Sequence, residues 1–423
     1  MEHAAQYRKY KEIVFIENLE DYKSGGFHPI HIGDHFKENR YQILNKLGHG
    51  RCSTVWLAED VLNKICVAIS ISQAQISQES SENDTSHENT QKTIRILQHL
   101  ADGTKLEEKG RSNVLLPLDI FNLSGPNGTH SCIVTHLQGQ SLAMVTKRDL
   151  GRLSEVLPLP KAKRAISSLL KGFAYIHSRG VCHGDLHPGN LLLDLPDPVS
   201  QSLGRINSIC GPPRIVPIER LDGKDLEPNV PKYGVEAALG RFSDLSLYSG
   251  DMKVADFGCG YFTNDPPTEI DFFGPYIVPE QYCTGLIGTA SDVWTVGCAI
   301  WLLLSGRDIF GTVNDPPEKV FSIMTDTLGG PPEFILRAWR DRLPDDDLHI
   351  SIHPSTSLVQ RVQQLRTGNE ELWMKARLNE FSEEDVALVT ELLTLIFKYD
   401  PADRPTLESI LRHPAMKFFG DVI

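Results

Sequence analysis

The residues of this 423-residue chain that are best suited to chemistry lie in three short stretches, and the most specific is "VCHGDLHPGNLLL" (181–193). It places Asp185 five residues before Asn190, with the basic residue His187 between them. An aspartate at such a position can accept or orient the proton of a hydroxyl nucleophile, and the asparagine can hold a metal ion on phosphate groups. The spacing therefore predicts a phosphoryl-transfer loop. We expect His183 to serve in packing.

The second stretch is "MKVADFGCG" (252–260), an apolar strand followed by Asp256-Phe257-Gly258. An aspartate in this position can chelate Mg²⁺ that bridges phosphate groups. The tripeptide is common by itself. Its place after a strand and downstream of an Asp-x4-Asn loop indicates that the two stretches serve one site.

The third stretch is "LGHGRCSTVWLAED" (47–60), with Gly48 and Gly50, then Ser53 where a third glycine would be expected, then Val55. Glycines in a β-hairpin let backbone N–H groups approach phosphate oxygens, and the valine can cover an adenine. Gly-x-Gly also occurs in many plain turns. Its position between two predicted strands favours the phosphate-binding interpretation.

Hydrophobic periodicity predicts the elements that must position these residues. Residues 41–70 show a strand-turn-strand pattern, and residues 114–137 return to strand character. From about residue 160 the pattern is helical, and its first helix ends on Gly180. Residues 195–250 are rich in Pro, Gly and Ser and predict an insertion with little regular structure. The predicted fold class is α+β, a small antiparallel sheet followed by a larger, mainly helical part.

Charge and composition exclude several classes of partner. The formal net charge of −13 argues against direct binding to nucleic acid and is compatible with a basic protein partner. Eight cysteines without CxxC or metal-ligand spacing favour a reducing compartment. The N-terminus lacks a signal-peptide pattern, and the longest apolar run, 296–304, is too short to span a bilayer. We expect no membrane association and a location in the cytoplasm and nucleus.

The order of these motifs resembles the eukaryotic protein kinases from about residue 41 to residue 416. Further matches lie downstream, at Pro279-Glu280, at Asp292-Val-Trp and at Arg404 of "DPADRP". In this setting Glu280 and Arg404 are expected to form a buried ion pair, and Asp292 is expected to brace the loop at 181–193.

A narrower resemblance is to the SR-protein kinases. Residues 18–60, "NLEDYKSGGFHPIHIGDHFKENRYQILNKLGHGRCSTVWLAED", are similar to the start of that family, including a serine in place of the third glycine. The resemblance implies a two-lobed kinase fold, with a small antiparallel N-lobe and a larger helical C-lobe. Its expected parts are an N-terminal extension packed on the domain (1–40), the N-lobe (41–137) and the C-lobe (138–419) with a spacer-like insertion (195–250).

The resemblance also implies a function. Such kinases use ATP and Mg²⁺ to phosphorylate serine in basic Arg/Ser-rich splicing proteins, and we expect this chain to act as a monomer. Asp185 and His187 would be catalytic, and Asn190 and Asp256 would bind the metal. The residues expected to bind ATP are Leu47, Gly48, Gly50, Ser53, Val55, Ala68, Ser70, Thr135 and Leu137.

Several residues depart from the family pattern. Ser70 in "ICVAIS" replaces the lysine that grips the phosphates, and Thr93 replaces the glutamate that holds this lysine. His187 stands where protein kinases have a lysine. Arginines are also absent at Gly184 and Ile277, so activation by a phosphorylated loop is not expected.

Three functional hypotheses follow. The first is a protein serine/threonine kinase of weakened activity, in which Mg²⁺ and bases such as Arg51 substitute for the missing cations. The second is a pseudokinase, a nucleotide-binding or scaffold module. The third is a small-molecule phosphotransferase, because "HGDLHPGN" is similar to the loop of aminoglycoside and choline kinases. Those enzymes generally lack the elements found here at 279–280, 292–294 and 400–404.

Overall fold

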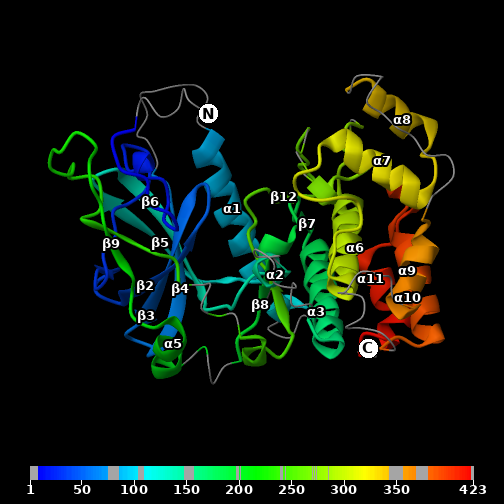
Figure 1. The fold of residues 1–423 in the computed structure, drawn as a ribbon, viewed down its shortest axis with the longest axis horizontal. Coiled ribbons are helices and arrows are strands. Elements are labelled where there is room, and N and C mark those ends of the chain that lie inside the picture. The colour runs from blue at the N-terminus through cyan, green and yellow to red at the C-terminus, as the bar shows by residue number, and fades with distance from the viewer. Residues whose placement is uncertain are drawn as a thin grey trace. The chain divides into compact units, whose positions relative to one another are not determined.

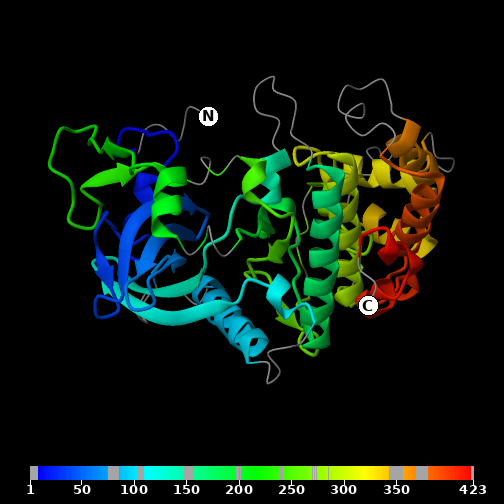
Figure 2. The ribbon, with the colours of Figure 1, turned by 90° about the horizontal axis from the view of Figure 1, so that it is seen from below.

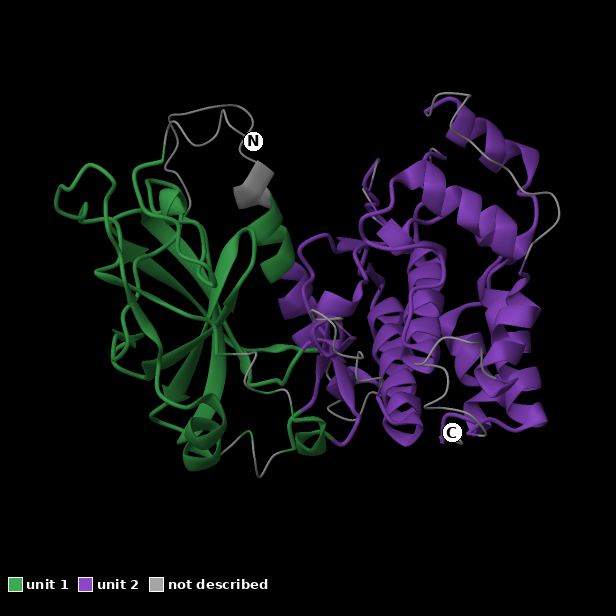
Figure 3. Cartoon of the chain, viewed as in Figure 1, with its two compact units in different colours: residues 1–94, 115–140, 195–248 green, residues 95–114, 141–194, 249–423 purple. Residues whose placement is uncertain are grey.

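The structure is a computed structural model, and it divides the chain into two compact units (Figure 3). We call them the sheet unit (residues 1–94, 115–140 and 195–248) and the helical unit (95–114, 141–194 and 249–423). The residues that the structure describes are 8–74, 85–102, 109–146, 157–196, 200, 202–238, 242, 244–268, 270, 272, 274–283, 285–342, 356–367 and 380–420.

The sheet unit contains a six-stranded antiparallel sheet, whose strands β2 to β6 are labelled in Figure 1. The strand order is β1-β2-β3-β4-β6-β5. Its strands are β1 (His35–Phe36), β2 (Tyr41–His49), β3 (Ser53–Asp60), β4 (Ile65–Ser72), β5 (Pro117–Gly125) and β6 (Gly128–His136). The strand pattern expected over 41–70 and 114–137 is confirmed. Consecutive strands are joined by short turns, which keeps the pairing local except where α1 (Thr85–Ala101) intervenes between β4 and β5.

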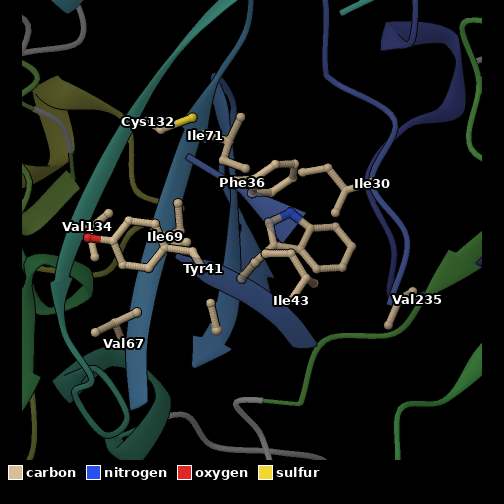
Figure 4. Close-up of a cluster of buried hydrophobic side chains, with 12 residues drawn as sticks. Ile30, Phe36, Tyr41, Ile43, Val67, Ile69, Ile71, Cys132, Val134 and Val235 are labelled. Carbon is tan, nitrogen blue, oxygen red and sulfur yellow. The ribbon is translucent and has the colours of Figure 1, made fainter. Parts of the chain in front are cut away.

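One face of this sheet carries the apolar core of the unit (Figure 4). Trp56, Ile69 and Val134 are paired across three neighbouring strands, so their side chains lie on the same face. Ile30, from before the first strand, and Val235, from the insertion, pack against the same cluster. Segments far apart in the sequence therefore share one core.

The insertion at 195–250 differs from the sequence-based expectation in two ways. It contains α5 (Leu203–Cys210) and an antiparallel pair, β9 (Ile215–Pro217) with β10 (Tyr233–Val235), rather than little regular structure. Residues 195–248 also belong to the sheet unit, whereas the sequence grouped them with 138–419. The reason is contact: the Ala238 N–H donates to the Lys46 carbonyl at 2.7 Å, and Asn45 Nδ2 donates to the Gly211 carbonyl at 3.3 Å.

The N-terminal segment also packs within the sheet unit. A second apolar cluster joins Leu19 and Phe27 of this segment to Ile218 and Val230 of the insertion. Asn127, in the turn between β5 and β6, donates hydrogen bonds to carbonyls of both segments. Of the extension expected over 1–40, residues 1–7 lie outside the described residues.

The helical unit is built around α3 (Leu159–Ser178) and α6 (Thr289–Ser305), which lie side by side (Figures 1 and 2). Gly180 follows α3 with a φ of +67°, in agreement with the predicted helix end. The other helices of this unit are α2 (Leu142–Thr146), α7 (Pro317–Leu328), α8 (Glu333–Arg340), α9 (Leu358–Thr367), α10 (Glu383–Ile396) and α11 (Leu407–Leu411). Among the described residues, none of the helices is long and apolar enough to cross a membrane.

Two short antiparallel pairs complete the helical unit. They are β7 (Val181–Cys182) with β12 (Tyr261–Phe262), and β8 (Leu191–Leu193) with β11 (Met252–Val254). Each pair brings a strand of the 181–193 stretch against a strand that flanks Asp256. These pairs set the geometry of the candidate site.

Glu280 and Arg404 form the expected ion pair, and both side chains are fully buried. Two guanidinium nitrogens of Arg404 donate to the two carboxylate oxygens of Glu280, each at 2.7 Å. Arg404 also donates to the carbonyl of Ala290, and the Ser291 hydroxyl donates to Glu280. Both charges therefore have partners inside the helical unit. The contacts of Arg404 with Ala290, and of Ser291 with Glu280, connect α6 to the segment at 398–404.

We expect Arg404→Met to lower the free energy of unfolding by about 3–5 kcal/mol, because it leaves the Glu280 carboxylate buried without its cation. Urea denaturation measures this loss. The matched control is Arg412→Met, whose exposed partner is Glu408, with an expected loss of about 1 kcal/mol or less. A loss for Arg404→Met as small as that of the control would contradict the assigned role.

Candidate active site

The loop at 181–193 is held by a carboxylate from α6. The backbone N–H groups of His183 and Gly184 donate to the two carboxylate oxygens of Asp292, at 2.8 and 3.0 Å. The His177 ring lies 3.0 Å from the same carboxylate. Burial by itself would raise the pKa of Asp292, but the hydrogen bonds and charges of these partners hold that pKa below its usual value. The expected bracing role of Asp292 is confirmed.

His183 is a packing residue, as expected, and it also joins two strands. Its buried ring lies between Phe173 and Phe257, with centroid separations of 5.7 and 5.1 Å. Nδ1 accepts the Asp185 N–H at 3.3 Å, so Nε2 carries the ring proton and donates to the Ala255 carbonyl at 3.0 Å. The loop is thereby connected to the end of β11.

The β8–β11 pair places Asn190 next to Asp256. Val254 is opposite Leu191, and the Ala255 N–H donates to the Asn190 carbonyl at 2.9 Å. The Asn190 amide nitrogen donates to the Asp185 carbonyl at 2.9 Å. This hydrogen bond uses the nitrogen of the side chain and leaves its oxygen, Oδ1, as a possible metal ligand.

Asp256 has an uncommon backbone conformation, with a φ of +65°. Its side chain is exposed, and Oδ1 accepts the Gly258 N–H at 3.1 Å. A non-glycine residue held in this region stores strain, and such residues concentrate at functional sites. Carboxylate and amide oxygens are the ligands that Mg²⁺ prefers, so the oxygens of Asp256 and Asn190 fit this ion.

Asp185 has a strongly perturbed carboxyl group. Burial, and then the negative charge of Asp256, raise its pKa to about 7. A carboxyl group with a pKa near neutrality, close to metal-ligand types, is a candidate catalytic base. The structure therefore brings together four residues that the sequence singled out, namely Asp185, His187, Asn190 and Asp256.

The residues expected to bind ATP through the sheet share one face of it. Val55 is paired with Ser70, and Ala68 is paired with Thr135, so these four side chains lie on the face opposite to Trp56. The Gly50 N–H donates to the Ser53 carbonyl at 2.8 Å in the β2–β3 turn. The remaining expected residues are Leu47 and Leu137, which are buried, and Gly48, which is paired with Val55.

Lys46 is the cation that sequence reasoning missed, and it does not replace the lysine absent at Ser70. Lys46 is fully buried in an ion pair with Glu17, and its Nζ lies 5.4 Å from the Trp56 ring centroid. It therefore lies on the core face, whereas Ser70 lies on the other. Burial lowers the pKa of Lys46 to about 7. The signal for this residue in the sequence was a single charged side chain, Lys46, within the alternating pattern of β2.

The other departures from the family pattern have local explanations. Gly184 has a φ of +75°, and a Cβ atom there would lie 2.7 Å from the Cys259 carbonyl oxygen, so an arginine does not fit. Thr93 lies in α1, where its hydroxyl donates to the Asn89 carbonyl at 2.8 Å. Arg51, offered above as a substitute cation, is exposed in the β2–β3 turn.

Comparison with known proteins agrees with this geometry. The sequence model of the protein kinase domain matches residues 41–199 and 245–416. This chain belongs to the protein kinase family. The match omits residues 200–244, which lie within the insertion described above.

Similar proteins indicate which group of protein kinases this chain resembles. Serine/threonine-protein kinase SRPK of Physarum polycephalum is 27% identical over 416 residues, which cover 95% of this chain and 91% of that protein. Serine/threonine-protein kinase SKY1 of Saccharomyces cerevisiae is 37% identical over 185 residues, 43% of this chain and 23% of that protein. SRSF protein kinase 3 of Homo sapiens is 33% identical over 185 residues, 43% of this chain and 30% of that protein. The kinase is thus similar to the SR-protein kinases.

A solved structure supports the fold. The crystal structure of the PF14_0431 kinase domain matches with a TM-score of 0.58 at 19% identity, over 90% of this chain and 98% of that one. The expected protein-kinase fold, with a small antiparallel sheet and a larger helical part, is confirmed.

We expect the Asp185 carboxyl group to titrate near pH 7 and to titrate at lower pH in Asp256→Asn, because that variant removes a nearby negative charge. Carboxyl ¹³C NMR of aspartate-labelled protein measures both values, with Asp185→Asn as the assignment control. A wild-type value near 4, or no change in the variant, would contradict the electrostatic coupling of the two residues.

Proposed function

We propose that this kinase is an active, ATP- and Mg²⁺-dependent protein serine/threonine kinase of the SR-protein kinase type. The observation that carries the proposal is the grouping of Asp185, Asn190 and Asp256 by Asp292 and the β8–β11 pair. A base and two oxygen ligands in one rigid frame are the parts that phosphoryl transfer requires.

In this proposal Asp185 accepts the proton of the substrate hydroxyl. Burial raises its pKa to about 7, which makes the carboxylate a stronger base while keeping it ionised at slightly alkaline pH. ATP bound with Mg²⁺ supplies the γ-phosphoryl group, and Asn190 and Asp256 would hold the metal. The hydrogen bonds from the loop amides to Asp292 position the backbone that carries Asp185.

We further propose that the substrates are basic Arg/Ser-rich proteins. A cavity of about 990 Å³ borders His187, Pro188 and Gly189 of the loop, and its charged lining is balanced, with Asp308, Asp315, Asp326, Arg307, Lys319 and Arg361. The support for a basic substrate is the net charge of −13 and the similarity to SRSF protein kinase 3. Action as a monomer, in the cytoplasm and nucleus, remains a prediction from the sequence.

We expect labelled phosphate to pass from Mg-ATP to an Arg-Ser peptide, and Asp185→Asn to reduce this transfer by about 10² or more because it removes the base. Filter-bound radioactivity measures the transfer. Equal background from both proteins would contradict the kinase proposal. A rise in melting temperature with Mg-ATP would then still identify a nucleotide-binding protein.

The second candidate function is a nucleotide-binding pseudokinase. The observation that favours it is the position of Ser70, because Lys46 lies on the other face of the sheet and is paired with Glu17. Phosphoryl transfer depends strongly on positive charge around the phosphates, and one lost contact can cost on the order of 10²–10³ in rate.

We expect the double variant Ser70→Lys/Thr93→Glu to raise phosphate transfer, because it restores a cation for the phosphates together with its partner. Initial rates at saturating Mg-ATP measure the gain, and Ser70→Lys alone is the control for an unpartnered lysine. An unchanged rate in the double variant would mean that the absence of the pair does not limit activity. It would point instead to His187 as the limiting residue.

A further inference from the structure

His187 has a defined arrangement of its two ring nitrogens. Nδ1 lies 3.0 Å from the Gly189 backbone nitrogen and accepts its N–H. A nitrogen that accepts a hydrogen bond carries no proton, so the proton of the neutral ring lies on Nε2. Nε2 is 3.8 Å from Oδ2 of Asp185.

This arrangement differs from that of the lysine it replaces. Because Nδ1 accepts the Gly189 N–H, the ring in this arrangement is neutral and carries its one proton on Nε2. The ring thus offers an N–H at Nε2 instead of a positive charge. The separation of 3.8 Å exceeds a hydrogen bond, but catalytic contacts are commonly long before substrate binds and shorten in the complex.

We propose that His187 is a positioning residue for the catalytic base, whose Nε2–H holds the Asp185 carboxylate in the orientation that receives the substrate proton. This inference rests on the proposed function. During transfer the hydroxyl proton of the substrate passes to Asp185, the new phosphate ester bond forms and the bond to ADP breaks, while His187 keeps its own proton.

The competing explanation is purely structural. His187 is also the N-cap of the 3₁₀ turn Pro188–Asn190, through the same Nδ1 contact. The chain offers a matched case: His413 caps the 3₁₀ turn Pro414–Lys417, and its Nδ1 accepts the Ala415 N–H at 3.2 Å. His413 Nε2 also lies 3.5 Å from a carboxylate oxygen of Glu391, so His413 is a matched histidine cap away from the 181–193 loop.

Two substitutions separate the cap from the donor. Asparagine places an oxygen where Nδ1 lies, so His187→Asn keeps the cap and loses the donor at the Nε2 position. Glutamine reaches the Nε2 position with an amide N–H, so His187→Gln keeps the donor and weakens the cap. If the proposal holds, His187→Asn loses at least about tenfold more kcat than His187→Gln, and His413→Asn leaves kcat unchanged. Equal kcat values for the two His187 variants would overturn the proposal.

The pH profile provides a readout that a structural role does not move. A donor stabilises the ionised carboxylate in the enzyme–substrate complex, so its loss in His187→Asn is expected to shift the acid limb of kcat upward by about half a unit or more. His187→Gln is expected to show a smaller shift. An acid limb that stays at the wild-type pH in His187→Asn would overturn the proposal, even if kcat fell.

NMR of the full chain separates this inference from the proposed function. In ring-¹⁵N-histidine protein at pH 7.5, His187 is expected to show a protonated Nε2 and an unprotonated Nδ1. A doubly protonated ring, or a proton on Nδ1, would overturn the proposal. These spectra require no activity, so absence of phosphate transfer would refute the kinase function without deciding the His187–Asp185 contact.

Discussion

The candidate active site depends on one buried carboxylate. Asp292, near the start of α6, accepts hydrogen bonds from two consecutive backbone amides of the loop that carries Asp185. A buried charge without partners would be costly, and these amides together with His177 satisfy it. The same contacts fix the direction of the loop. The β8–β11 pair then sets Asn190 and Asp256 beside Asp185.

This kinase differs from its family in having fewer cationic side chains at the positions expected to contact the phosphates. The backbone pairing that groups Asp185, Asn190 and Asp256 is in place, yet Ser70 and His187 stand where lysines are expected. Lys46 is buried on the core face of the sheet, and Gly184 leaves no space for an arginine. A neutral histidine that orients the base is one way to retain transfer chemistry with fewer cations, since a directional hydrogen bond and a charge act on different parts of the transition state.

The sheet unit shows how the extra segments are stabilised. Its core is completed by Ile30 from the N-terminal segment and by Val235 from the insertion. Asn127 donates hydrogen bonds to both segments, and Lys46 of the sheet is paired with Glu17 of the N-terminal segment. The insertion is therefore part of the sheet unit by packing, although it interrupts the helical part in the sequence and lies largely outside the kinase sequence model.

By itself, the sequence determined the kinase fold, the strands of the sheet, the Glu280–Arg404 pair and the grouping of Asp185, Asn190 and Asp256. Periodicity and motif spacing are local properties, and motif order carries the family resemblance. The tertiary structure alone decided the role of Lys46 and the packing of 195–248. It also gave the steric reason why an arginine does not fit at Gly184. These depend on which face of the sheet a side chain occupies and on contacts between distant segments. The position of the ring proton on His187 also depends on the tertiary structure, because it is set by the Gly189 amide in the folded loop.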